Sequence, residues 1–310
     1  MISINVGRPR APRLMLVVLI AMIVLLAPGK ARSQGPPAPA THEEVRVVTD
    51  DRGSRIQVNG RDMFIRGMNW DYIPIGQNYA YDFWAQPDEM ITAALDREMS
   101  LMAGMGVNAI RVYTGIPPRW VKYIHERYGI YSIINHTVGR YGFTLDGVWL
   151  PNTDYSSPKL RAALTADVAS MVEKYRGVPG VLMYLLGNEN NYGLSWSSFE
   201  IEALPKGERD TARARHLYSL FGEIIRATKT ADPSVPVAIA NGDLQYIDLI
   251  AQECKGLDVF GTNVYRGISS RDLFQVVKDK LGVPMLYTEF GADAFNAREM
   301  REDRRCRRAT

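Results

Sequence analysis

Two glutamates stand directly after apolar stretches of this sequence. The six residues 181–186, VLMYLL, are apolar without interruption, and Gly187, Asn188 and Glu189 follow them. Residues 284–288 form a second strand-like run that ends at Glu289. Short apolar runs of this kind are typical of strands buried on both faces of a parallel sheet. If both strands present their glutamate at the same edge, the two carboxyl groups face each other, which is the usual arrangement for cleaving a glycosidic bond.

That chemistry requires two acidic groups with different tasks. An acetal is cleaved when its leaving oxygen receives a proton while a negative charge faces the developing oxocarbenium ion. Two carboxyl groups can do both if their surroundings push their pKa values apart. We predict that the carboxyl groups of Glu189 and Glu289 lie about 5–5.5 Å apart, the separation found in retaining enzymes.

Composition indicates a globular protein with a sizeable core. The chain has 310 residues, enough for one large domain or two small ones, with 46% hydrophobic and 23% charged residues. The net charge of +3 is weak, and no basic stripe is interleaved with stacking aromatics, so we do not expect nucleic acid as a partner.

The N-terminal region has the layout of a signal peptide. Residues 1–13 carry three arginines and no acid, residues 14–27 are wholly apolar, and small residues follow at Ala31 and Ser33. We predict a signal peptide over residues 1–33 and export to the periplasm or the medium, with an uncleaved membrane anchor as the alternative. Residues 34–44 read as a Pro/Ala linker.

From residue 45 onward, strand-like and helix-like segments alternate. Short strands over Val45–Arg66, with Asn59-Gly60 as a turn, predict an N-terminal β-hairpin. The expected barrel strands are Met63–Asn69, Asn108–Tyr113, Ile130–Asn135, Val181–Asn188, Val235–Asn241, Leu257–Tyr265 and Pro284–Glu289. The expected helices are Pro87–Met105, Pro118–Tyr128, Lys159–Tyr175, Ala212–Ala231, Tyr246–Glu253 and Ser270–Lys280. Residues 136–158 are expected to form a long loop.

This alternation predicts an α/β fold, a (β/α)8 TIM barrel over residues 45–295 with its site at the carboxyl ends of the strands. An open doubly wound sheet is the alternative, although no Gly-rich phosphate loop follows the first strand. After Glu289 the chain reads GADAFNAREMREDRRCRRAT, which contains no apolar strand. We therefore expect a barrel truncated after its seventh strand and a charged tail over residues 296–310.

The order of these motifs resembles a known family. Ile65–Asn69, Asn108–Tyr113, Gly187-Asn188-Glu189 and Thr288–Gly291 stand where the retaining glycoside hydrolases of clan A carry their site motifs. The likeness is greatest to the catalytic TIM barrel of glycoside hydrolase family 2. The Arg-Val-Tyr run at residues 111–113 also looks like the fungal β-1,3-glucan transglycosidases. Two features depart from family 2: no β-sandwich domains precede the barrel, and no eighth strand supplies an aromatic platform.

The resemblance implies roles for particular residues. Glu189 would be the general acid/base and Glu289 the nucleophile, while Asn188 would bind the sugar 2-hydroxyl. Arg111 would keep Glu289 ionised through a charge-assisted hydrogen bond, and Tyr265 would hold the same carboxylate through its hydroxyl. Each residue also has a structural reading: Arg111 as an ion-pair partner and Tyr265 as core packing.

Further candidates for sugar contacts lie at the expected strand ends and in loops. Asn69 and Trp70, at the end of the first strand, either line the sugar site or only pack. Trp149 and Trp196, both in loops, suit sugar-stacking platforms or lid packing. His136 ends the third strand and either touches sugar or is a structural histidine.

We expect no metal and no cofactor. His42, His125 and His216 show no metal-ligand spacing, and neither do Cys254 and Cys306. The two cysteines form one disulfide or remain free thiols.

The sequence thus predicts an exported enzyme that acts on a β-linked oligo- or polysaccharide and needs no obligate protein partner. The same residues would serve a β-glucan transglycosidase, in which a sugar hydroxyl replaces water. A catalytically inert carbohydrate-binding barrel is the non-enzymatic alternative.

Overall fold

The computed structural model describes most of the chain after residue 42. Described are residues 43–291 apart from 52, 79, 114 and 267–268, together with the backbone of 295–296 and 301–302. Contacts between Cα atoms divide the chain into Met1–Pro39 and Ala40–Thr310, and every described residue belongs to the second unit. The expected signal peptide and nearly all of the expected linker lie outside the described residues and stay predictions. No described helix combines the length and the apolar character needed to cross a bilayer.

Seven parallel strands form a nearly closed barrel. They are β4 (Gly67–Asn69), β5 (Ala109–Val112), β6 (Tyr131–His136), β9 (Val181–Leu186), β10 (Val237–Gly242), β11 (Val259–Val264) and β12 (Met285–Phe290). Their order in the sheet follows their order in the chain, from β4 to β12, and every neighbouring pair is parallel. The α/β barrel predicted from the alternation of strands and helices is therefore confirmed.

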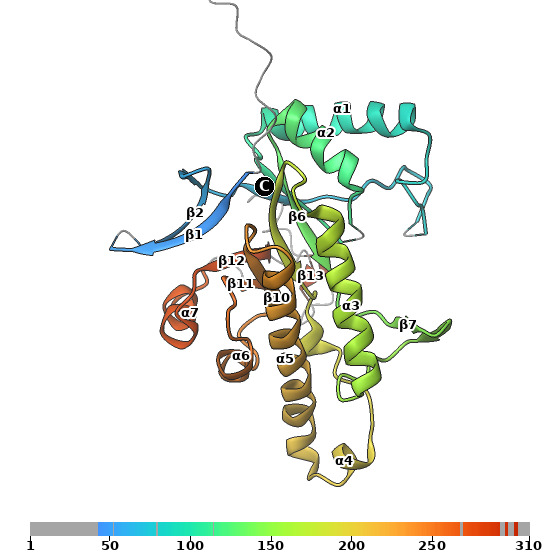
Figure 1. Ribbon diagram of the computed structural model, residues 1–310, viewed down its shortest axis with the longest axis vertical. Helices are drawn as coiled ribbons and strands as arrows, with labels where there is room; N and C mark the ends of the chain where they lie inside the picture. Colours follow the sequence, from blue (N-terminus) through green and yellow to red (C-terminus); the bar gives the residue numbers. More distant parts are fainter. Residues whose placement is uncertain are drawn as a thin grey trace, which may run out of the picture. The chain divides into compact units, whose positions relative to one another are not determined.

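Helices connect the strands in the order that a barrel requires (Figure 1). They are α1 (Asp88–Gly104), α2 (Pro118–Tyr128), α3 (Pro158–Tyr175), α5 (Lys206–Ala231), α6 (Ile247–Glu253) and α7 (Leu273–Leu281). Local signals set several ends: Pro118 opens α2, Gly129 closes it in the left-handed conformation, and the Ser157 hydroxyl caps α3 by accepting from the Leu160 amide. A short helix, α4 (Phe199–Glu202), and a 3-10 turn, η1 (Asn190–Tyr192), lie between β9 and α5.

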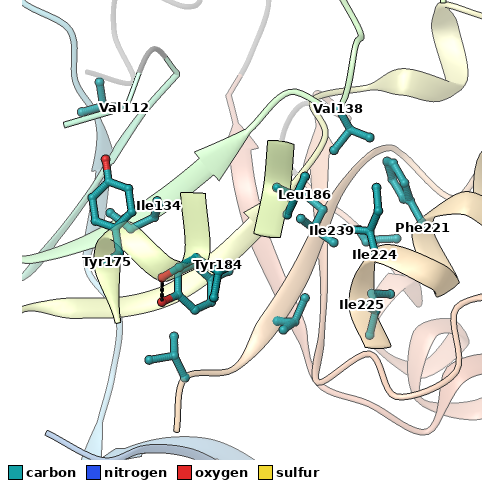
Figure 2. Close-up of a cluster of buried hydrophobic side chains, with 14 of the residues drawn as sticks. Val112, Ile134, Val138, Tyr175, Tyr184, Leu186, Phe221, Ile224, Ile225 and Ile239 are labelled. Atoms are coloured by element: carbon teal, nitrogen blue, oxygen red, sulfur yellow. Dashed lines mark hydrogen bonds between the residues drawn. The ribbon is translucent and has the colours of Figure 1, made fainter. Parts of the chain in front are cut away.

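The larger core lies between the strands and their helices. Alternate residues of each strand point outward, so Tyr184 and Leu186 of β9 belong to the same cluster as Phe221 of α5. Figure 2 shows this arrangement, with strand residues such as Ile134 and Ile239 near side chains of α3 and α5. All of these side chains are buried. The helices therefore fix the outer face of the barrel.

A second cluster fills the inside of the barrel at its amino-terminal end. An antiparallel sheet of β1 (Val45–Asp50), β2 (Gly53–Val58) and β3 (Arg61–Met63) contributes apolar side chains to this cluster. Val45 and Ile56 pack there with inward-facing residues such as Ile133 and Met183. The N-terminal strands thus close one end of the barrel, and the site must lie at the other.

The first barrel strand is shorter than predicted. Met63 pairs with Ile56 in the N-terminal sheet, and barrel pairing begins only at Gly67. Between them, the Asn108 side chain accepts a hydrogen bond from the Arg66 amide at 2.8 Å and donates to the Phe64 carbonyl at 2.8 Å. These two bonds satisfy backbone groups that a strand partner would otherwise take, which is why the expected strand Met63–Asn69 is divided.

The expected loop 136–158 contains a hairpin. The strands β7 (Phe143–Leu145) and β8 (Val148–Leu150) pair antiparallel around Asp146 and Gly147, both of which have positive φ. Asp-Gly is a strong signal for a two-residue hairpin turn, and this signal was present in the sequence.

The barrel stays open between β4 and β12. These two strands exchange no backbone hydrogen bonds, and an apolar cavity of about 720 Å³ lies between them. Side chains cross the gap: Asn69 Nδ2 donates to the Thr288 carbonyl at 3.1 Å, and Arg111 Nη1 reaches the same oxygen at 3.4 Å. After Phe290, the described backbone contains only the short antiparallel pair β13 (Phe295–Asn296) and β14 (Arg301–Glu302), and the rest of the expected tail lies outside the described residues.

Candidate active site

The turn after β9 brings Glu189 to the carboxyl edge of the barrel. Glu189 has a left-handed backbone conformation, φ 55°, which is costly for a residue with a side chain and persists only when its surroundings enforce it. Its amide donates to the Ala240 carbonyl at 2.9 Å, and its carbonyl accepts from Arg140 Nε at 3.0 Å. The Asn190 side chain accepts from the Asn188 amide at 2.9 Å. The hydrogen bonds with Ala240, Arg140 and Asn190 therefore fix the conformation of this turn.

Glu289 reaches the same edge from β12. Glu289 pairs with Asn263 of β11, just after a register shift that follows Thr262. Such irregularities bend a strand and re-aim its side chains. The Glu289 carboxylate, 16% exposed, stays accessible from the open end of the barrel.

Three donors hold the two oxygens of Glu289. Arg111 Nη1 donates to Oε1 at 3.1 Å, and the Tyr113 hydroxyl donates to the same oxygen at 2.7 Å. The Tyr265 hydroxyl donates to Oε2 at 2.9 Å. The contacts expected from Arg111 and Tyr265 are thus present, and Tyr113 adds a third. A carboxylate anion accepts from all three donors at once.

The Arg111 guanidinium is locked in place. It is 3% exposed and donates through Nε to Asn135 Oδ1 and through Nη2 to Asn188 Oδ1, both at 2.8 Å. Burial lowers the pKa of Arg111, whereas the negative charge of Glu289 opposes that change. Because Asn135 and Asn188 hold the buried Arg111 guanidinium, it positions the Glu289 carboxylate more firmly than an exposed arginine would.

Asn263 connects the two glutamates. Its Nδ2 donates to Glu189 Oε1 at 3.1 Å and contacts Asn188 Oδ1 at 3.3 Å. Because Asn188 also accepts from Arg111, an unbroken chain of hydrogen bonds runs from Glu189 to Glu289. Both carboxyl groups therefore belong to one polar network at the open end of the barrel.

Both phenols of this network remain donors at neutral pH. Burial raises the pKa of Tyr265 to about 12, and the hydrogen bond to the Glu289 carboxylate acts in the same direction. Burial also raises the pKa of Tyr113, against the opposing charge of Arg111. A protonated phenol can only stabilise negative charge on Glu289.

A sequence model described as the glycosyl hydrolases family 2, TIM barrel domain, matches residues 48–305 of this chain. The chain belongs to glycosyl hydrolase family 2. A comparison with curated protein sequences gave no match. The family resemblance carried by the strand-end motifs is thereby confirmed.

Solved structures that share the fold include enzymes for acidic sugars. The Parabacteroides merdae β-glucuronidase with glycerol in its active site is 18% identical over 81% of this chain and 27% of that one, with a TM-score of 0.53. The Bacteroides uniformis β-glucuronidase 2 bound covalently to cyclophellitol-6-carboxylate aziridine is 16% identical over 81% of this chain and 27% of that one, with a TM-score of 0.57. The Eisenbergiella tayi β-galacturonidase bound to galacturonate is 16% identical over 82% of this chain and 39% of that one, with a TM-score of 0.53.

These likenesses show the fold alone. The family 2 chain spans well under half the length of each of these relatives.

Five of the predicted sugar contacts lie outside the network, and two of these, Trp196 and His136, contact other parts of the protein. Trp196 is 4% exposed and packs edge-on against Tyr155, with ring centroids 5.5 Å apart, and its role as a stacking platform or as lid packing stays a prediction. His136 uses both ring nitrogens on the protein: Nε2 pairs with Asp167 of α3 at 3.0 Å, and Nδ1 accepts from the Val138 amide at 3.0 Å. The hydrogen bond from His136 lowers the pKa of Asp167.

The other aromatic candidates differ in accessibility. Trp149 lies on the β7–β8 hairpin and is 59% exposed, so its ring is free to contact a ligand. Trp70 is almost fully buried within an aromatic cluster. Asn69 binds Thr288 across the open seam and contacts neither glutamate. Asn69, Trp70 and Trp149 therefore stay predictions as sugar contacts.

Four network residues were not predicted from the sequence: Tyr113, Asn135, Asn263 and Tyr141. A period of two along β5 would have found Tyr113, because residues 111 and 113 of an extended strand point to the same side. Asn135 and Asn263 are amides near the ends of mostly apolar strands, which is a usable signal. Tyr141, whose hydroxyl accepts from Asn188 Nδ2 at 2.6 Å, lies in a loop and carries no such signal.

Within the part of the chain that the structure describes, no group of three or more His, Cys, Asp or Glu side chains is arranged to hold a metal ion. Cys254 is buried and free, and Cys306 lies outside the described residues.

Proposed function

We propose that this family 2 chain is a retaining β-glycoside hydrolase in which Glu289 is the nucleophile and Glu189 the general acid/base. The single observation that carries this proposal is the polar network that joins the two glutamates at the carboxyl ends of β9 and β12. Family membership supports the same reading. The carboxyl separation of about 5–5.5 Å remains a prediction of this mechanism.

The surroundings of the two glutamates support the division of roles. Glu289 accepts from a cation and two phenols, so it suits the group that must be an anion before each turnover. Among the described residues, Glu189 accepts one side-chain hydrogen bond, from the neutral amide of Asn263. With no cation paired to it, Glu189 is free to carry a proton and release it.

The reaction then proceeds as a double displacement. A Glu289 oxygen attacks the anomeric carbon while the bond to the leaving oxygen breaks, and Glu189 transfers its proton to that oxygen. In the second step the Glu189 carboxylate takes a proton from water, whose oxygen attacks the same carbon and releases Glu289. Two inversions give net retention, and both glutamates return to their starting states.

We also propose a class of substrate, on the basis of the similar solved structures. The similar solved structures are β-glucuronidases and a β-galacturonidase, which supports a β-linked glycoside as the substrate. A sugar hydroxyl in place of water would give transglycosylation with the same two residues.

Replacement of the nucleophile provides the first test. We expect Glu289→Gln to lower kcat/KM on an aryl β-glycoside by roughly 10³-fold or more, because no covalent intermediate can form. Glu253→Gln, which removes the carboxylate that pairs α6 with Arg215 of α5, lies outside the network, is the matched control and should retain the parent rate. Parent activity in Glu289→Gln would refute the assignment. Labelling by a 2-fluoro glycoside, located by mass spectrometry, should occur at Glu289; sugar binding without labelling would favour the inert barrel.

The acid/base is tested through the leaving group. Glu189→Ala should slow substrates with poor leaving groups most, since only these need protonation. Azide should restore part of the rate by attacking the glycosyl-enzyme directly. Uniform slowing across leaving groups without azide rescue would remove Glu189 from this role.

A further inference from the structure

A second cavity, of about 340 Å³, opens in the loop that follows β4. Val112 forms part of its wall, and its side chain points to the opposite face of β5 from Arg111, which holds Glu289. The Trp70 amide, which continues the pairing of β4 with β5, donates to the Arg111 carbonyl at 2.9 Å. The cavity therefore shares β5 with the reaction centre and lies against the outer face of that strand.

The walls of this cavity are aromatic and mutually packed. The Phe83 ring lies 4.6 Å from Tyr72 and 4.7 Å from Trp84, centroid to centroid, and Trp70 packs edge-on against Trp84 at 6.3 Å. Phe83 and Trp70 are buried, whereas Tyr72 and Trp84 remain partly accessible. Rings held in this way offer flat apolar surfaces at little entropic cost.

Two carboxylates stand at the same cavity. Asp71 is accessible and makes no hydrogen bond or ion pair with the described residues, while Asp82 accepts one hydrogen bond, from the Ala85 amide at 3.2 Å. Enough protein surrounds Asp71 that desolvation raises its pKa, although the charge of Arg111 opposes this change. None of the described residues that line the cavity is a lysine, arginine or histidine.

The charge that opposes the change in the Asp71 pKa belongs to Arg111. Arg111 donates to Asn135, Asn188 and Glu289, so its hydrogen bonds are directed to the reaction centre. An acidic sugar in this cavity would therefore place a third negative charge beside two carboxylates, and none of the described lining residues is a cation that could balance it. Hydroxyl groups, in contrast, are donors that Asp71 can accept.

We propose that this cavity is a subsite for a sugar unit that carries no carboxylate, with the accessible rings stacking on the sugar and Asp71 accepting from its hydroxyls. This inference rests on the proposed function and narrows its substrate class. It separates this chain from the similar structures, whose printed ligands and activities involve uronic acids. The physical reason is the unbalanced negative charge of Asp71 and Asp82.

A binding experiment on a catalytically arrested protein tests the inference. Calorimetric titration of the Glu289→Gln chain with a neutral β-gluco-oligosaccharide, and with a matched oligosaccharide containing β-linked glucuronate, should show binding of the neutral ligand at least about 10-fold tighter. Adding Asp71→Asn should weaken binding of the neutral oligosaccharide by about 10-fold and reduce the difference in affinity between the neutral and the acidic oligosaccharide. Asp88→Asn, an exposed ion-pair partner of Arg119 at the start of α1, should leave both constants unchanged.

The outcomes separate the two proposals. Equal or tighter binding of the glucuronate ligand, no binding of either ligand, or constants unaffected by Asp71→Asn would each overturn the subsite. Asp82→Asn, measured in parallel, keeps the test decisive if Asp71→Asn fails to fold. Hydrolysis of aryl β-glycosides by the parent chain is measured separately. Asp71-dependent binding without hydrolysis would refute the proposed enzymatic function and support the subsite. Hydrolysis without Asp71-dependent binding would support the enzymatic function and refute the subsite.

Discussion

At the scale of single residues, the two oxygens of Glu289 are treated differently by the protein. Oε1 faces Arg111 and Tyr113, whereas Oε2 accepts from Tyr265 alone among the residues that the structure describes. Tyr265 is 49% exposed, so water competes for its hydrogen bond, while the Tyr113 ring lies under the Arg111 guanidinium at 4.3 Å. Oε2 is thus the more weakly held oxygen, and it is the better candidate to form the bond to the sugar.

This asymmetry predicts unequal effects of removing the two phenols. A hydrogen bond to a charged group contributes about 1.5–3 kcal/mol, which corresponds to roughly 10- to 100-fold in rate. We expect Tyr113→Phe to lower kcat/KM by roughly this factor and Tyr265→Phe to lower it less. Steady-state kinetics on an aryl β-glycoside checks both values.

Tyr123→Phe is a suitable control for these variants, because the Tyr123 hydroxyl binds Asp96 on α1 and contacts no residue of the network. Rates for Tyr113→Phe that match this control would contradict the role of Tyr113. A larger loss in Tyr265→Phe than in Tyr113→Phe would reverse the proposed ranking.

At the scale of elements, close helix packing determines how firmly the site is supported. Helix α5 packs against α3, α6 and the turn η1 that follows Glu189. Gly222 of α5 lies so close to the end of α6 that an added Cβ would come within 2.2 Å of the Glu253 carbonyl oxygen. No side chain fits at this contact, because backbone atoms cannot move aside as a flexible side chain can.

A pair of glycine variants on the same helix tests this contact. Gly222→Ala should lower the free energy of unfolding by about 1–3 kcal/mol, the usual cost of overpacking. Gly207→Ala, at a position where a Cβ meets nothing within 4 Å, should be neutral or slightly stabilising. Urea denaturation measures both changes. Equal stabilities of the two variants would show that α5 and α6 can separate at no cost.

At the scale of the whole described barrel, the N-terminal strands are tied to the barrel floor by Glu43. Its Oε2 accepts from the Gly180 amide at 3.0 Å and pairs with His125 of α2 at 3.3 Å, while Oε1 accepts from the Tyr131 hydroxyl at 3.2 Å. The hydrogen bond from His125, with help from Gly180, holds the pKa of Glu43 below its ordinary value. Three elements thus meet at one carboxylate.

The lowered pKa gives this link a defined pH dependence. Because the folded chain binds the Glu43 proton less tightly than the unfolded chain, the stabilisation is fully present above the ordinary pKa of 4.5. It is lost as the pH falls through the lower folded value. We expect Glu43→Gln to cost about 1–2 kcal/mol at pH 7, and the difference from the parent should shrink below about pH 4.5.

Thermal or urea unfolding of parent and Glu43→Gln over pH 3–8 checks this expectation. A difference that stays constant across the whole range would mean that the side chain acts through packing and not through its charge.

Several parts of the fold and the site could be read from residue patterns. An unbroken apolar run indicated β9, which is buried along its whole length, whereas β12 is a half-buried strand beside the open seam, so the prediction of burial on both faces was wrong for it. Glu189, after β9, and Glu289, near the end of β12, both belong to the polar network, as their strand-end positions suggested. The Asp146-Gly147 hairpin and the shared face of Arg111 and Tyr113 also have local signals in the sequence, although we predicted neither. These features depend on neighbours in the chain, which is why sequence can reveal them.

Other features depend on contacts between distant segments. No local pattern distinguishes Trp149, which is exposed on a hairpin, from Trp196, which is buried against Tyr155. His136 ends a strand in the expected place, and its partner Asp167 lies on the following helix, a contact that the local sequence does not reveal. The early end of the first strand depends on Asn108, a residue of another β/α unit.

The sequence by itself determined the alternation of strands and helices, the family and the two glutamates, because hydrophobic period and strand-end motifs are local properties of the chain. Only the tertiary structure decided which donors meet Glu289, since Arg111, Tyr113 and Tyr265 come from two strands, β5 and the end of β11, on either side of it. The same holds for the aromatic cavity, where Asp71 meets no cation among the described lining residues. Which charges face each other is set by how the strands close around a shared interior.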